Sequence, residues 1–390
     1  MRRWAASDER NDLGYTARVN TRISVGSVLL AFTGLRIDGG IAVVSRSIAR
    51  ALEEETRAGH LERVDRVLLL ERTQEAAPPP LRGEQHLARG SQARFVWQTW
   101  RSHRRFRHDL VCFDLVGLAR SVLFPLPGFP PKRFAVFVHG AEIETARRGA
   151  RARALREAHH LLVNSEFTAA ALRAAIPSRA DRIRVVPLCI DPERIAQWEA
   201  VDKGAPLVRE PAALLVGRMW SEERGKGHDA LIEGWPEVRR RVPAAELWIV
   251  GEGDDTGRMQ GLARDRGVAD AVRFLGRVSD AELGALYRRA SVFAMPSRQE
   301  GFGLVYAEAM WHGLPCIGST ADAAGQVIDD GVTGRLVPYA DARASADAVA
   351  SLLSDPGRAR AMGEAGRHRA RELFTYERFR SALLHGLDLG

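Results

Sequence analysis

The sequence predicts an α/β protein built from two doubly wound domains that face each other across a cleft. Its 390 residues are too many for a single ordinary core and enough for two. Short apolar runs alternate with longer amphipathic stretches, which is the pattern of βαβ units around a parallel sheet. The pattern stops at a polar segment, residues 201–211, and then starts again. This restart indicates two Rossmann-like domains, and the ligand is expected between them, beyond the carboxyl ends of the strands.

The first domain is expected over residues 23–200, behind a flexible N-terminal tail at 1–22. That tail is charged and contains no apolar segment, so no signal peptide is expected. Residues 72–91 contain three consecutive prolines and are interpreted as a surface loop. A helix is expected at 41–57, and strands at 25–31, 66–70, 110–113, 133–138, 160–163 and 183–186.

The second domain is expected over residues 212–372, after the linker at 201–211. It repeats the alternation of the first domain, and a last helix is expected at 374–387. The other helices are expected at 228–241, 280–290 and 303–311, and the strands at 212–216, 246–250, 272–275, 292–295, 315–318 and 335–337.

The charge of the chain lies in its first half. Residues 1–205 carry 33 Lys and Arg against 23 Asp and Glu, a net charge of +10, whereas residues 206–390 carry 24 against 26. A one-sided basic lobe fits an anionic lipid surface or an anionic acceptor, and arginines on ordinary solvated faces would explain it equally well. No nucleic-acid-binding module is visible, so no nucleic acid partner is expected.

Bulk properties also exclude a membrane-spanning chain and a cysteine-based metal site. No apolar run approaches the ~18 residues that span a bilayer, which indicates a cytoplasmic protein. Cys112, Cys189 and Cys316 are far apart and stand in apolar sequence, so they are interpreted as buried hydrophobic residues and not as metal ligands.

The strongest motif is the stretch 299–309, which follows a predicted strand and opens a helix. Gly301 and Gly303 allow a sharp turn and leave backbone N–H groups uncovered at a helix start, where a diphosphate is stabilised. Glu300 and Glu308 are roughly 10–12 Å apart along the chain, too far for a paired acid and base. That spacing suits two carboxylates that bind hydroxyls at opposite ends of an extended ligand. The alternative is one glutamate at a helix start and another on a solvated face.

A second motif follows the first strand of the second domain. Gly217 and Arg218 are succeeded by a loop that contains Lys226 between two glycines. The two cations could converge on a diphosphate, the arginine as a fork and the lysine as a point charge. The alternative is a solvated loop, and the glycine spacing excludes a Walker loop.

Three weaker signals stand at strand ends, where ligands lie in this kind of fold. Gly39 and Gly40 follow the first strand, and His139 follows the strand at 133–138. Gly251 and Val278 follow successive strands of the second domain and could contact a nucleotide through backbone groups. Turn glycines and a core histidine would explain the same residues.

In order and spacing these motifs resemble the retaining GT-B glycosyltransferases of family 4, the glycogen-synthase-like and mannosyltransferase-like group. The resemblance runs from residue 29 to 384 and is strongest at 214–336, where Asp330-Gly331-Val332-Thr333-Gly334 also appears. It implies that the terminal segment 373–390 crosses back to the first domain. One departure stands at 322–327, where relatives often carry Gly-Gly-x-Pro-Glu and this chain has Gln326 in place of the acid.

The resemblance also implies a role for each matching residue. Arg218 and Lys226 would bind the diphosphate, Glu308 the ribose, and His139 would lie beside the anomeric carbon. Glu300 would bind the donor sugar. The donor site would be completed by Gly39, Gly40, Gly217, Gly251, Val278, Gly301, Phe302, Gly303 and Leu304, and the cleft edge of the first domain by Asn164, Ser165 and Asp191.

The implied reaction is hexose transfer with retention of configuration, from GDP-mannose or UDP-glucose to a saccharide or lipid-linked saccharide of the cell envelope or of an exopolysaccharide. No cofactor is implied, and no Asp-x-Asp triplet is present to bridge a metal to the diphosphate. The basic first lobe fits a peripheral position at the inner face of the cytoplasmic membrane. Two alternatives remain: a nucleotide-sugar epimerase on the same fold, and a non-catalytic nucleotide-sugar-binding protein.

Overall fold

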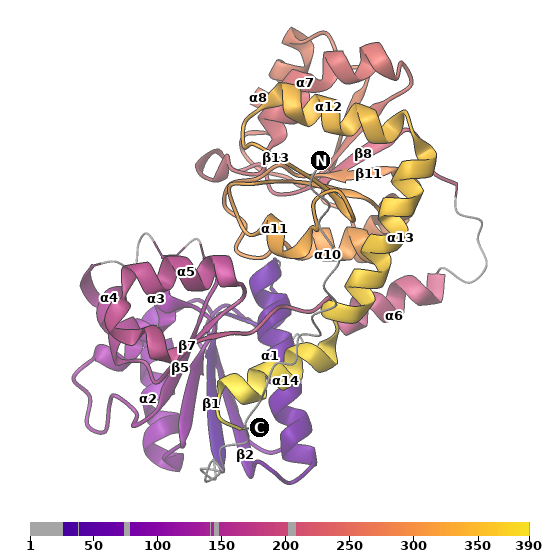
Figure 1. Ribbon diagram of the computed structural model, residues 1–390. Helices are drawn as coiled ribbons and strands as arrows, with labels where there is room; N and C mark the ends of the chain where they lie inside the picture. Colours follow the sequence, from indigo (N-terminus) through magenta and orange to yellow (C-terminus); the bar gives the residue numbers. More distant parts are fainter. Residues whose placement is uncertain are drawn as a thin grey trace, which may run out of the picture.

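Two parallel sheets, one in each half of the chain, form two lobes in the computed structural model (Figure 1). The structure describes residues 26–37, 39–73, 79–140, 142–143, 148–201 and 208–389. The expected tail at 1–22 and most of the expected linker at 201–211 lie outside these ranges. The predicted fold class is confirmed, because both sheets are doubly wound and all their strand pairs are parallel.

The first sheet has the strand order β3-β2-β1-β4-β5-β6-β7. Its strands are β1 (Ser27–Phe32), β2 (Arg63–Leu68), β3 (Gln85–Leu87), β4 (Leu110–Phe113), β5 (Phe134–Val138), β6 (His160–Val163) and β7 (Ile183–Val185). The interpretation of 72–91 as a loop without a strand was wrong, because β3 lies within it. This edge strand has only three residues and one apolar side chain, so no alternation marked it.

Helices cover both faces of this sheet. Helix α1 is buried along one face by small and branched apolar residues at helical spacing, such as Val44, Ile48 and Leu52. The helices of this half of the chain are α1 (Gly40–Arg57), α2 (Gln92–Phe106), α3 (Val116–Ala119), α4 (Gly149–Glu157) and α5 (Glu166–Ala175), with the 3₁₀ turns η1 (Arg120–Leu123) and η2 (Pro177–Arg182). They are followed by α6 (Pro192–Val201), which packs on the second lobe.

The second sheet repeats the topology with the order β10-β9-β8-β11-β12-β13. Its strands are β8 (Ala212–Val216), β9 (Glu246–Val250), β10 (Val272–Gly276), β11 (Val292–Ala294), β12 (Cys316–Ser319) and β13 (Gly334–Val337). Its helices are α7 (His228–Arg241), α8 (Thr256–Asp265), α9 (Asp280–Arg289), α10 (Leu304–Trp311), α11 (Ala324–Val327), α12 (Ala342–Leu353) and α13 (Pro356–Leu373), with the 3₁₀ turn η3 (Ser221–Glu223).

The central strands are buried on both faces, which is why they read as continuous apolar runs. Leu29 and Leu214, on the first strands of the two sheets, are both fully buried. The three cysteines are buried free thiols, as expected, and burial raises the pKa of the Cys112 and Cys189 thiols to about 12. Among the described residues, no helix combines the length and apolar character that crossing a membrane requires.

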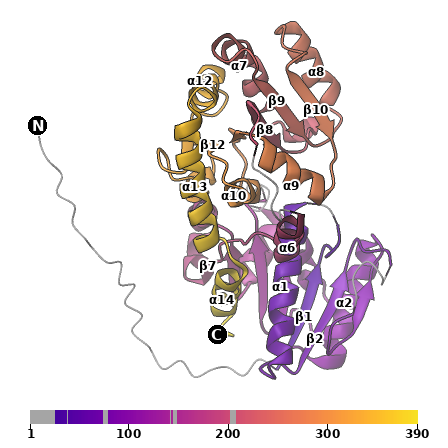
Figure 2. The same cartoon turned by 90° about the vertical axis from the view of Figure 1, so that its right-hand side faces the viewer.

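The described residues include one complete crossing between the lobes, near the end of the chain. Helix α14 (Tyr376–Gly386) follows α13 and packs against α1 and β7 of the first lobe, where Arg380 forms an ion pair with Glu55 (Figure 1). Helix α6 precedes the other crossing and packs against α9 of the second lobe (Figure 2). The Trp198 indole Nε1 donates to the Asp280 carbonyl at 3.1 Å, and its ring packs edge-on against Tyr287.

Candidate active site between the lobes

The two lobes touch where the loop after β11 meets the start of α5, and we call this contact the lobe junction. The Gly301 carbonyl oxygen accepts hydrogen bonds from the Ser165 hydroxyl at 2.6 Å and the Thr168 hydroxyl at 3.3 Å. The Glu166 backbone N–H donates to Gln326 Oε1 at 2.9 Å. Ser165 follows β6 and Gly301 follows β11, so the carboxyl ends of the two sheets meet here, where doubly wound folds bind ligands.

A buried aspartate supports the loop that carries Glu300. Asp322 accepts hydrogen bonds from the Ser297 hydroxyl at 2.6 Å, the Glu300 N–H at 3.1 Å and the Ala324 N–H at 3.0 Å. Burial raises the pKa of Asp322, and these three donors oppose that effect by stabilising its charged form. The loop is therefore fixed from beneath by residues of its own lobe.

The loop then enters α10 through Gly303, whose φ of 89° lies in the left-handed region that favours glycine. Leu304 is the first residue of the helix. The Phe302 ring is buried and packs edge-on against Phe374, between α13 and α14. The predicted helix start after Gly303 is thus present, with its first N–H groups at the lobe junction.

The structure brings Lys226 and Glu300 together as an ion pair between the two strongest motifs. Arg218 points elsewhere: its guanidinium lies 3.0 Å from Glu223, and 64% of its side chain is exposed. Gly217 packs against the Lys226 stem, because a Cβ on Gly217 would lie 3.4 Å from Lys226 Cγ. Of the two predicted phosphate ligands, Lys226 is therefore at the site. Arg218 lies on the same loop, in a solvent-exposed ion pair with Glu223.

The glycines predicted to contact the donor pack against each other along the carboxyl edge of the second sheet. The Gly251 N–H donates to the Gly276 carbonyl at 2.8 Å. Gly251 has a φ of 137°, and a side chain there would overlap the Gly217 carbonyl oxygen. Val278, half-buried, follows two residues after Gly276. These positions form one edge of part-buried backbone between Lys226 and the end of β10.

His139 lies at the junction with its imidazole oriented by the backbone. The ring stacks on Phe137 at 5.1 Å, and Nε2 donates to the Asp114 carbonyl oxygen at 2.8 Å. The His139 N–H donates to Glu142 at 3.0 Å. Burial lowers the pKa of His139 to about 4, so the ring is neutral at physiological pH. Because a carbonyl can only accept, Nε2 carries the proton and Nδ1 the lone pair.

The Gly39-Gly40 turn opens α1 opposite α10. Gly39 is the N-cap of α1 with a φ of 109°, and a Cβ on Gly40 would lie 3.9 Å from Leu304. Asp38, in the same turn, lies outside the described residues. The turn thus borders the start of α10 from the first lobe.

Two buried acids hold the loop between β1 and α1, and the sequence analysis missed both. Asp114 accepts from the Thr33 N–H at 2.8 Å and the Ser45 hydroxyl at 2.9 Å, and burial raises its pKa to about 7. Glu71 accepts from the Leu35 N–H at 2.7 Å. Each acid follows a buried strand closely in sequence, which was the available signal.

Glu308 is already paired in this structure. Only 3% of it is exposed, one carboxylate oxygen forms an ion pair with Arg194 of α6, and the other accepts from the Tyr287 hydroxyl at 3.1 Å. Arg194 also contacts Asp280 at 2.8 Å. Burial raises the pKa of Glu308, while Arg194 favours its charged form. A ribose at this position would add hydroxyls to a carboxylate that Arg194 and Tyr287 orient.

The remaining first-lobe candidates also lie at the junction or beside it. Asn164 Nδ2 donates to the His139 carbonyl at 3.3 Å, and its Oδ1 is buried without a partner. Asp191, at the start of α6, accepts from Arg46 Nε at 3.2 Å. Asn164 thus belongs to the lobe junction, and Asp191 ties α6 to α1.

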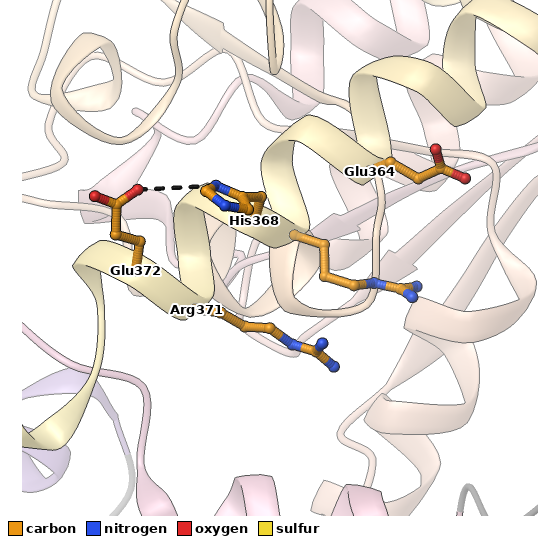
Figure 3. Close-up of a pocket in the computed structure, with 5 residues that line it drawn as sticks. Glu364, His368, Arg371 and Glu372 are labelled. Atoms are coloured by element: carbon orange, nitrogen blue, oxygen red, sulfur yellow. Dashed lines mark ion pairs between the residues drawn. The ribbon is translucent and has the colours of Figure 1, made fainter.

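Side chains of α13 line a hollow (Figure 3), which lies away from this site. Arg371 packs over the Trp311 ring, and Arg367 donates to the His312 carbonyl, so the hollow adjoins the C-terminal end of α10. The motif at 299–309 lies at the other end of that helix. The hollow is lined by Glu364, Arg367, His368, Arg371 and Glu372. In the described part of the chain, no cluster of three His, Cys, Asp or Glu side chains could hold a metal ion.

Comparison with known proteins matches each half of the chain to a family of glycosyltransferase domains. Residues 38–194 match the family described as Glycosyltransferase Family 4, and residues 210–355 match Glycosyl transferases group 1. The fold and these matches place the chain in the GT-B glycosyltransferase class. Its first lobe carries the Glycosyltransferase Family 4 domain, and its second lobe carries the group 1 domain.

Similar proteins share parts of the chain or its whole fold. A GDP-mannose-dependent alpha-(1-6)-phosphatidylinositol monomannoside mannosyltransferase of Mycolicibacterium smegmatis is 45% identical over 37% of this chain and 39% of its own length. A glycogen synthase of Mycobacterium tuberculosis is 38% identical over 43% of this chain and 40% of its own. The chain thus aligns with less than half the length of these relatives.

Two solved structures align with this chain along nearly their whole length. Sucrose-phosphate synthase from Thermosynechococcus elongatus has a TM-score of 0.71 at 24% identity, covering 93% of this chain and 97% of its own. Anabaena Alr3699/HepE in complex with UDP and glucose has a TM-score of 0.73 at 17% identity, covering 93% and 99%. At these identities the likeness shows the GT-B fold alone.

Proposed function

We propose that this protein transfers a hexose from a nucleotide-diphosphate sugar to a saccharide or lipid-linked saccharide acceptor, with retention of the anomeric configuration and without a metal ion. The observation that carries the proposal is the Lys226–Glu300 ion pair beside the start of α10 at the lobe junction. It puts a cation for a phosphate, a carboxylate for a sugar and a helix N-terminus in one place.

Donor binding exchanges partners at this pair. The diphosphate takes Lys226 from Glu300, and the freed carboxylate accepts hydroxyls of the donor sugar. Arg218 leaves Glu223 to join the diphosphate, at small cost because an exposed ion pair is worth at most about 1 kcal/mol. The two cations then stabilise the negative charge that develops on the departing nucleoside diphosphate.

The neutral His139 fits a role beside the reacting carbon and not a role as a charged phosphate ligand. Its Nδ1 lone pair is an acceptor for a sugar hydroxyl, since Nε2 is committed to the Asp114 carbonyl. The acceptor hydroxyl attacks the face that the diphosphate leaves, and the leaving phosphate takes its proton. No side chain forms a covalent intermediate in this scheme, and catalysis rests on positioning and electrostatics.

The names of the relatives favour GDP-mannose as the donor, with UDP-glucose as the second choice, and a lipid-linked acceptor.

A surface of α2 supports access to an anionic membrane from the cytoplasmic side. Trp97 is 49% exposed with Arg101 stacked 5.1 Å from its ring, and Arg104 lies 5.4 Å from the Trp100 ring. Aromatic rings and arginines together suit the interface of an anionic bilayer.

The test is product analysis with GDP-mannose and UDP-glucose labelled in the sugar. We expect the label in a larger saccharide or lipid product, with the anomeric configuration of the donor. Label that stays in an altered free sugar nucleotide would identify an epimerase. Binding of the donor without transfer or slow hydrolysis would identify a non-catalytic binding protein.

A further inference from the structure

Gly301 fits into a socket on the first lobe that leaves no room for a side chain. We call this the Gly301 socket, formed by the His139 carbonyl, Asn164, Ser165 and Thr168. A Cβ on Gly301 would overlap the His139 carbonyl oxygen and lie 2.9 Å from Asn164 Nδ2. Gly301 does not have a positive φ, so its own backbone conformation does not require glycine. The contact between the lobes is what requires it.

We propose that the Gly301 socket couples closure of the lobes to assembly of the donor-sugar site, with Ser165 and Thr168 as positioning residues. This inference rests on the proposed function. On the second-lobe side, Asp322 holds the Glu300 N–H. On the first-lobe side, two hydroxyls hold the Gly301 carbonyl. The backbone that presents Glu300 to the sugar is therefore fixed at both ends only when the lobes touch.

The geometry of the peptide bond extends this control to the next residue. In a trans peptide the carbonyl and the following N–H point in opposite directions. Drawing the Gly301 carbonyl into the socket thus aims the Phe302 N–H away from Ser165 and Thr168. Separation of the lobes frees this peptide plane to rotate, so the turn before α10 loses one oriented donor.

Gln326 adds a second bond between the lobes beside the socket. Ser165 is the N-cap of α5 and accepts from the Thr168 N–H at 3.1 Å, while Gln326 accepts from the Glu166 N–H at 2.9 Å. The free N–H groups in the first turn of α5 are thus hydrogen-bonded partly by the N-cap Ser165 and partly by Gln326 of the other lobe. This explains the departure from the Gly-Gly-x-Pro-Glu pattern: a neutral amide accepts the N–H without placing a second carboxylate beside Glu166.

The first experiment substitutes Gly301→Ala, which adds one methyl group at the socket. Lys226 and the glycine edge of the second lobe are unchanged in this variant, so affinity for GDP and UDP should fall less than tenfold, even though the N–H groups at the start of α10 also face the diphosphate. Transfer should fall at least 100-fold. Small-angle X-ray scattering should show that wild type becomes more compact with GDP-mannose or UDP-glucose and that the variant does not. A variant that compacts like wild type would overturn the proposal.

The second experiment changes the socket without touching the donor loop. Ser165→Ala with Thr168→Val removes both hydroxyls, and Ser165→Thr with Thr168→Ser keeps them as the matched control. The first pair should lower kcat roughly tenfold or more and leave the Kd of GDP and UDP unchanged, and the control pair should restore kcat. An equal loss of nucleotide affinity and kcat, or no rescue by the control pair, would indicate a merely structural role and refute the inference.

These readouts separate the inference from the proposed function. Scattering and nucleotide binding report lobe closure whether or not a sugar is transferred. Wild type that compacts with a sugar nucleotide, while Gly301→Ala stays open, supports the socket even if product analysis finds no transfer. Wild type that transfers a hexose without any compaction refutes the socket and leaves the proposed function standing.

Discussion

Arg194→Met should destabilise the second lobe more than any loss of a surface ion pair. Glu308 is almost fully buried, and Arg194 is its only cationic partner among the contacts that the described residues make with it. Removing one member of a buried ion pair costs about 3–5 kcal/mol, because the other charge stays in a medium of low dielectric constant. The Tyr287 hydroxyl still donates to Glu308, which places the expected loss near the lower end, about 3 kcal/mol.

The loss should depend on pH with a definite sign. Burial already raises the Glu308 pKa above its ordinary value of 4.5, and loss of Arg194 raises it further. Between the unfolded and folded pKa values, the folded protein binds more protons than the unfolded chain, so stability falls as the pH rises through that interval. Above the folded pKa the penalty is constant. The gap between wild type and variant should thus be largest near pH 8 and should narrow towards pH 5.

Urea unfolding followed by tryptophan fluorescence at pH 8 and pH 5 measures this gap. Arg194→Met with Glu308→Gln removes the buried charge and should recover at least half of the loss. Arg153→Met, which breaks an exposed pair with Glu157, is the matched control and should change stability by less than about 1 kcal/mol. Equal stability of Arg194→Met and wild type at both pH values would refute the reasoning.

Three further predictions concern the proposed reaction. Lys226→Ala and Arg218→Ala should each remove about 2–4 kcal/mol of transition-state stabilisation, roughly 30- to 1000-fold in kcat/KM, and near-normal turnover in either variant would contradict their roles. Transfer should be unchanged in excess chelator, since the chain has no Asp-x-Asp triplet; a loss that Mg²⁺ restores would count against this. Wild type should float with anionic but not neutral vesicles at low salt, and Trp97→Ser with Arg101→Ser should float less; equal flotation with both vesicle types would argue against membrane docking.

The sequence predicted the sheets well because their strands are buried on both faces. Four strands have the predicted bounds, at 110–113, 160–163, 212–216 and 246–250. A parallel strand in such a sheet is a short apolar run bounded by polar residues, so its limits are visible without structural context. Edge strand β3 lacks this signal, since it is held by backbone pairing with β2 and its side chains are only half-buried.

The site was predictable where its parts are close along the chain or end a strand. Gly217, Lys226 and Glu300 all follow strands of one sheet, so the topology brings them to one edge. The partner of Glu308 was not predictable, because Arg194 is 114 residues away and stands on α6, a helix that precedes the second lobe in sequence and packs against it in space. No local pattern distinguishes an arginine that will be buried in this way from one on a solvated face.

Both glutamates of the strongest motif are paired with a cation, Glu300 with Lys226 and Glu308 with Arg194. The two pairs differ in what a diphosphate can take from them. The two cations are exposed to a similar degree, 22% for Lys226 and 19% for Arg194, but Lys226 comes from the glycine-rich loop, whereas Arg194 is also held by Asp280 and by its position on α6. Under the proposed function, a diphosphate would therefore compete for Lys226 more readily than for Arg194. Phosphate binding at one end of the motif would free Glu300 for the sugar, while Glu308 would stay oriented by Arg194 for the ribose. A single exchange of ion-pair partners would then link recognition of the phosphate to recognition of the sugar.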